Sequence, residues 1–84
     1  MNLRDMYDIL VACNIHIRHN HIYEPRLQNE VEEDTRSTLA QLRRYITQYP
    51  RYQYLNKGLN QAAKSLDLMY ILGELEKILN ELGE

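Results

Sequence analysis

The residue types that could do chemistry gather in one acid-free stretch, residues 35–66. It contains no aspartate or glutamate, yet it holds six of the ten lysine and arginine residues of the chain. The cations are Arg36, Arg43, Arg44, Arg51, Lys57 and Lys64, and Tyr45, Tyr49, Tyr52 and Tyr54 lie among them. Guanidinium groups donate paired hydrogen bonds to phosphate or carboxylate, and exposed tyrosines can stack on bases. The pattern indicates a site for an anion or a binding partner, with candidate residues Arg43, Arg44, Arg51, Tyr52, Tyr54 and Lys57.

A structural interpretation of the same stretch stays open. Tyr45 and Tyr49 continue an apolar helical stripe and would then belong to the core. Arg43 and Arg44 approach a helix end, where the helix dipole favours cations. The acidic residues on both sides of the stretch could also neutralise it, within one fold or across a dimer.

A second set consists of residue types that bind metal ions, but their spacing along the chain does not suit a single site. Cys13, His16 and His19 follow at steps of three, with His21 close behind. Each step moves the position about 60° around a helix of 3.6 residues per turn, so one ion cannot easily meet all three. The chain has no second cysteine to support such a site. We expect no metal ion, and we interpret the histidines as surface residues near a helix end.

Motifs for catalysis are missing from the sequence. No serine stands in a nucleophile elbow, and the three glycines form no phosphate-binding loop. Cys13 falls on an apolar helical face and is interpreted as a small core residue. We therefore expect neither an enzyme nor a cofactor.

Length and composition favour one small domain, residues 1–84. With 44% hydrophobic residues, the chain has material for a single core. A net charge of −2 argues against a protein that coats DNA through its overall charge, although a local field can still attract an anion. The single cysteine excludes an intramolecular disulfide, and no run reaches the roughly 18 apolar residues of a membrane span. We expect a cytoplasmic protein.

Apolar spacing predicts a first helix over residues 3–19. Its apolar residues recur at intervals of three and four, and Asn2 is a candidate for its N-cap. Residues 15–18 also alternate with β-branched Ile15 and Ile17, as in a strand. A lone strand has nothing to pair with in a chain this short, so helix is favoured unless two chains pair.

Two further helices are predicted over residues 30–48 and 59–82. Asn29 is a candidate cap for the earlier one, with Pro25 as an alternative first residue, and Pro50 stops it. The later one has an alternative start at Leu55 and ends at Gly83. These elements predict an all-α fold, a three-helix arrangement built on an antiparallel hairpin.

The apolar stripe of the last predicted helix is broader than one neighbouring helix would cover. Its members are Leu68, Ile71, Leu72, Leu75, Ile78 and Leu79. We interpret this stripe as an interface, either with a second copy or with a partner protein, and the alternative is the core of a monomer. Because a core of this size gives little surplus stability, a homodimer is expected.

These observations favour a small non-catalytic binding or regulatory protein that acts by stoichiometric protein–protein contact. An inhibitor or adaptor of the phage- or plasmid-encoded type has this size. The alternative is binding of nucleic acid or a nucleotide through the basic, tyrosine-rich segment 36–57. No membrane contact is expected.

Overall fold

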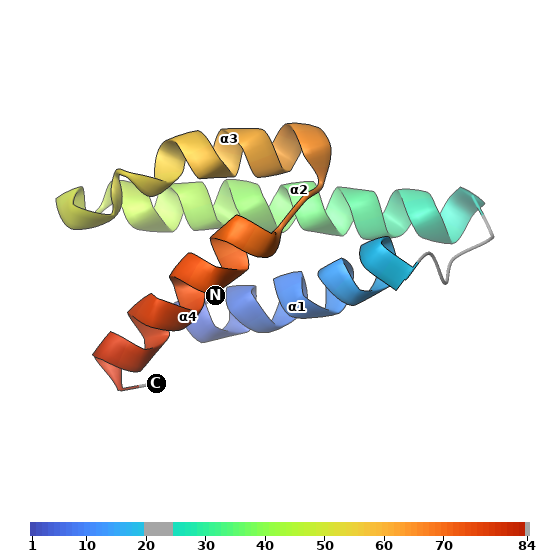
Figure 1. Ribbon diagram of the computed structural model, residues 1–84. Helices are drawn as coiled ribbons and strands as arrows, with labels where there is room; N and C mark the ends of the chain where they lie inside the picture. The colour runs from blue at the N-terminus through green and yellow to red at the C-terminus, as the bar shows by residue number, and fades with distance from the viewer. Residues whose placement is uncertain (20–24, 84) are drawn as a thin grey trace.

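The computed structural model describes residues 1–19 and 25–83, and every regular element in these ranges is helical (Figure 1). In chain order the elements are α1 (Leu3–His19), α2 (Pro25–Thr47), the 3₁₀ helix η1 (Pro50–Tyr52), α3 (Leu55–Ser65) and α4 (Met69–Leu82). The predicted all-α class is confirmed, and residues 15–18 lie in α1 rather than in a strand. Within the described ranges, no helix is both long and apolar enough to cross a membrane.

The start of α1 agrees with the sequence prediction, and α2 starts at the predicted alternative, Pro25, rather than after Asn29. The backbone N–H of Asp5 donates to Asn2 Oδ1 at 2.8 Å, so Asn2 caps α1. α2 begins at Pro25, where the missing N–H of proline costs no helical hydrogen bond. Asn29 therefore lies inside α2, and its predicted capping role is wrong. Residues 20–24, between α1 and α2, lie outside the described residues.

α2 is the central helix of the arrangement. It runs antiparallel to α1 on one side and to α3 on the other, and it contacts both (Figure 1). α4 crosses this layer obliquely and contacts α1 and α3. The apolar faces of the four α-helices, together with Tyr52 of η1, enclose the hydrophobic core. Thr35 is also buried, and its hydroxyl donates to the Val31 carbonyl at 2.7 Å, so it brings no unpaired polar group into the core.

The prediction of one helix over residues 59–82 is wrong, because the chain turns between α3 and α4. Leu66 ends α3 in the left-handed conformation, with φ 58° and ψ 23°. The Asp67 N–H donates to Ser65 Oγ at 3.1 Å, and the Met69 N–H donates to Asp67 Oδ1 at 3.2 Å. These two side chains satisfy backbone donors that a continuous helix would have paired internally. The predicted end of α4 at Gly83 is confirmed.

The turn lays α4 across two neighbours, and this explains the breadth of its apolar stripe. Five of the six predicted interface residues are at most 3% exposed; they are Leu68, Ile71, Leu75, Ile78 and Leu79. Leu72 is half-buried. The stripe is broad because α4 packs on α1 and α3 at once. The five buried side chains are covered by their own chain and offer no surface to a partner.

Candidate binding grooves

The structure separates the six candidate anion-binding residues into three places. They are Arg43 and Arg44 on α2, Arg51 and Tyr52 in η1, and Tyr54 and Lys57 at the beginning of α3. Two of these places border a groove. The sequence pattern grouped these six residues as one cluster, but the fold places them apart.

The first place is a groove between α2 and α3, which we call the arginine groove. It has a volume of about 280 Å³ and is lined by Arg36, Leu39, Ala40, Arg43, Arg44 and Ala63. Two of its arginines also join the helices. Arg36 Nε donates to the Ala63 carbonyl at 3.2 Å, and the Arg43 guanidinium donates to Asn60 Oδ1. These contacts hold the side chains along the rim, above a floor of small and apolar residues.

The cations of the acid-free stretch are largely free of carboxylate partners. Arg36 Nη1 lies 3.8 Å from Glu32 Oε2, in an exposed pair one helical turn apart. Within residues 1–19 and 25–83, five other cations of the stretch form no ion pair; they are Arg43, Arg44, Arg51, Lys57 and Lys64. The acidic flanks of the described chain therefore leave most of this positive charge unneutralised.

The second place, η1, is taken up by contacts within the fold. Tyr52 is only 5% exposed, and its ring centroid lies 5.8 Å from that of Tyr49. The guanidinium carbon of Arg51 lies 4.9 Å from the centroid of the Tyr52 ring, at cation–π distance. Tyr45 and Tyr49 are partly buried and pack against the core. Because Tyr52 is covered, it has no free face on which a base could stack.

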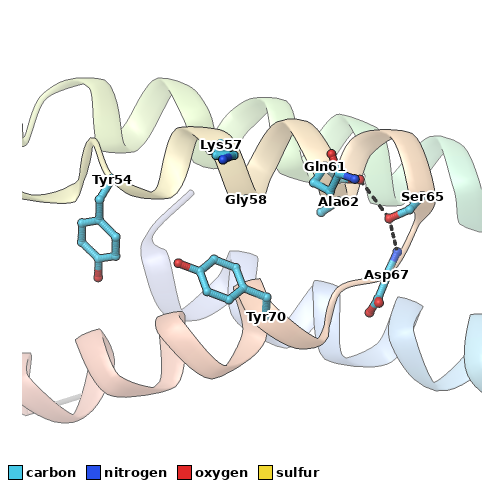
Figure 2. Close-up of a pocket in the computed structure, with 8 residues that line it drawn as sticks. All are labelled: Tyr54, Lys57, Gly58, Gln61, Ala62, Ser65, Asp67 and Tyr70. Carbon is cyan, nitrogen blue, oxygen red and sulfur yellow. Dashed lines mark hydrogen bonds between the residues drawn. The ribbon is translucent and has the colours of Figure 1, made fainter.

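The third place is a groove between α3 and α4, which we call the tyrosine groove. It has a volume of about 360 Å³ and is lined by Tyr54, Lys57, Gly58, Gln61, Ala62, Ser65, Asp67 and Tyr70. Figure 2 shows Tyr70 between the two helices, with its hydroxyl end directed toward Tyr54. Gly58 makes room for this ring, since a Cβ atom at Gly58 would lie 2.6 Å from Tyr70 Cε2. Tyr54 and Tyr70 are 55% and 54% exposed.

A carboxylate beside the tyrosine groove accepts hydrogen bonds from two sides. The Tyr54 hydroxyl donates to Glu74 Oε2 at 3.3 Å, and Lys77 Nζ lies 3.4 Å from Glu74 Oε1. Partial burial, and then the negative charge of Glu74, raises the pKa of Tyr54, so the hydroxyl stays a neutral donor. Sequence reasoning missed Tyr70 and Glu74, because only the turn at Leu66 brings their helix alongside α3.

The residues considered for a metal site are spread over different surroundings. Cys13 is buried in the core, while His16 and His19 are exposed. No three histidine, cysteine, aspartate or glutamate side chains within the described ranges are grouped to hold an ion. His21 lies outside the described residues.

Comparison with known proteins finds no relative, because no family model, no curated protein and no solved structure matches this chain. The function must therefore be argued from the two grooves and their charges.

Proposed function

We propose that this protein is a non-catalytic binding protein whose arginine groove holds an acidic segment of a partner protein. The supporting observation is the set of five cations in the acid-free stretch that form no ion pair with any described carboxylate. A local concentration of such charges keeps a positive field at the surface even though the net charge of the chain is −2. Binding of one partner segment per chain would then regulate that partner by occupying its acidic region.

The floor of the arginine groove favours a polypeptide as the ligand. Leu39, Ala40 and Ala63 supply small and apolar lining between the guanidinium groups. An acidic amphipathic segment can place apolar side chains on that floor and carboxylates against Arg43 and Arg44, which bind carboxylate as a planar fork.

Nucleic acid, the alternative ligand, has less support from the same surface. Single strands gain much of their affinity from bases stacked on exposed aromatic rings. Tyr52 is buried, and Tyr54 lies by the other groove with its hydroxyl on Glu74. Among the described residues, none that lines the arginine groove is aromatic. The remaining chemistry there is that of a carboxylate-binding surface with an apolar floor.

A single copy of the chain is the binding unit in this proposal. The expectation of a homodimer rested on the small size of the core and on the stripe of α4, and five of the six stripe residues are covered inside one chain. Association through those five residues would require α4 to leave α1 and α3. The exposed cations need no such opening to meet a partner.

The proposal is tested by measuring the anisotropy of a short labelled polyglutamate peptide and, in parallel, of a labelled DNA duplex. We expect saturable binding of polyglutamate that weakens with added salt. The double variant Arg43→Gln with Arg44→Gln should weaken that binding about tenfold, because two direct carboxylate contacts are lost. A matched control is Arg18→Gln with Arg26→Gln, which removes the same charge from residues outside the groove. Arg26 lies about 25 Å from Arg43 along α2 at 1.5 Å per residue, and Arg18 is on α1.

Two results would contradict the proposal. Equal weakening by the two double variants would show that net charge, and not the arginine groove, controls binding. Tighter binding of the duplex than of polyglutamate would favour nucleic acid as the ligand instead.

A further inference from the structure

The tyrosine groove has the form of a receptor for one large side chain. Tyr70 lies across the bare backbone at Gly58 and leaves about half of its surface exposed. Figure 2 shows the groove running from Tyr54 at one end to Ser65 and Asp67 at the other. Exposed tyrosines beside an open groove of about 360 Å³ are typical of the anchor points of protein interfaces.

One cation at this groove has no partner within the fold. The Asp67 carboxylate accepts the Met69 N–H at 3.2 Å, and Glu74 accepts the Tyr54 hydroxyl and pairs with Lys77. Within the described ranges, Lys57 is the one charged residue of the groove lining that has no hydrogen bond or ion pair. A carboxylate of a partner can therefore pair with Lys57 at this groove.

The two grooves are joined by the exposed ridge of α3. Lys57 and Lys64 are seven residues apart, so they lie on one stripe of this helix, about 10 Å from each other. Asn60, which bonds to Arg43, lies on one side of the stripe, and Gln61, which lines the tyrosine groove, lies on the other. Cationic side chains thus continue from the arginine groove over α3 to the rim of the tyrosine groove.

From this continuity we infer that the tyrosine groove binds an aromatic or large aliphatic anchor side chain of the same acidic segment. This inference rests on the proposed function, since it assigns a second contact to that partner. The anchor packs against Tyr70 over Gly58 and Ala62, and neighbouring carboxylates of the segment face Lys57 and Lys64. Recognition then requires acidic and aromatic residues together, which distinguishes this partner from a plain polyanion.

The test compares two probes, polyglutamate and a glutamate–tyrosine copolymer of the same length, by fluorescence anisotropy or calorimetry. The copolymer should bind about tenfold more tightly, the ordinary effect of one aromatic anchor in a groove. Tyr70→Ala should reduce copolymer binding to the level of polyglutamate, while Tyr70→Phe should keep the preference. Ile15→Ala is the matched control, because Ile15 is 49% exposed on α1. Circular dichroism checks that each variant is folded.

The outcomes separate this inference from the function on which it rests. If polyglutamate binds but the copolymer binds no more tightly, the tyrosine groove is not an anchor site and the arginine groove is unaffected. The same conclusion follows if Tyr70→Ala keeps the preference for the copolymer. If neither polymer binds, both the proposed function and the anchor site are overturned.

Discussion

At the scale of single residues, Gly58 and Gly73 share a helical backbone but have different surroundings. Both lie inside α-helices, where glycine costs about 1 kcal/mol relative to alanine. A Cβ atom at Gly73 would meet nothing within 4 Å. At Gly58 it would lie 2.6 Å from Tyr70 Cε2 and 3.2 Å from Ile71 Cδ1. Gly58 is therefore required by a close approach, and Gly73 is not.

The two alanine substitutions should separate these cases. Gly73→Ala is expected to raise the free energy of unfolding by about 1 kcal/mol through helix propensity alone. Gly58→Ala should fall short of that gain by about 1 kcal/mol or more, because the added methyl displaces Tyr70 and crowds Ile71. Urea unfolding of both variants measures the difference. Equal gains would mean that Tyr70 does not lie against Gly58.

Sequence alone could identify the types of residue at the site but not their neighbours. The acid-free stretch pointed to Arg43 and Arg44, and both line the arginine groove. It also grouped Tyr52 with the exposed residues, although that ring is buried beside Tyr49. The exposure of a tyrosine depends on which helix packs over it, and the spacing of residues in one segment does not contain that information.

At the scale of elements, the turn between α3 and α4 decides the form of the molecule. A straight helix would carry the apolar residues of its second half away from α1, whereas the left-handed Leu66 brings them across α1 and α3. Non-glycine residues in this conformation cost about 1 kcal/mol or more. Helical periodicity predicted both halves, because each half is helical. It missed the turn, because the apolar pattern passes through Leu66 and Leu68 without interruption.

Replacing Leu66 by alanine and by glycine tests this turn, because the backbone conformation at position 66 decides which of the two variants is more stable. Both variants lose the same packing of a half-buried side chain. In the left-handed conformation, Leu66→Gly should be more stable than Leu66→Ala by about 1 kcal/mol, since glycine has no steric penalty there. In an unbroken helix the order would be reversed by a similar amount. Thermal or urea unfolding gives the order, and a more stable alanine variant would contradict the turn.

At the scale of the whole molecule, charge is distributed lengthwise along α2. The half of α2 that carries Glu30, Glu32, Glu33 and Asp34 lies beside the end of α1 that contains Arg18 and His19. The other half carries Arg43 and Arg44 and continues through η1 into the cationic ridge of α3. Within residues 67–83, the acidic residues lie on the turn and on α4. The net charge of −2 therefore conceals a separation of acidic and basic residues within the molecule.

The most direct measurement is a titration of the isotope-labelled protein with polyglutamate, followed through its backbone amide NMR shifts. We expect the largest changes at residues 36–44 of α2 and 57–64 of α3, saturating at one binding site per chain and diminishing with added salt. The matching amides of α1 should change little. Changes centred on α1, or none at low salt, would contradict the central claim that the arginine groove is the binding surface.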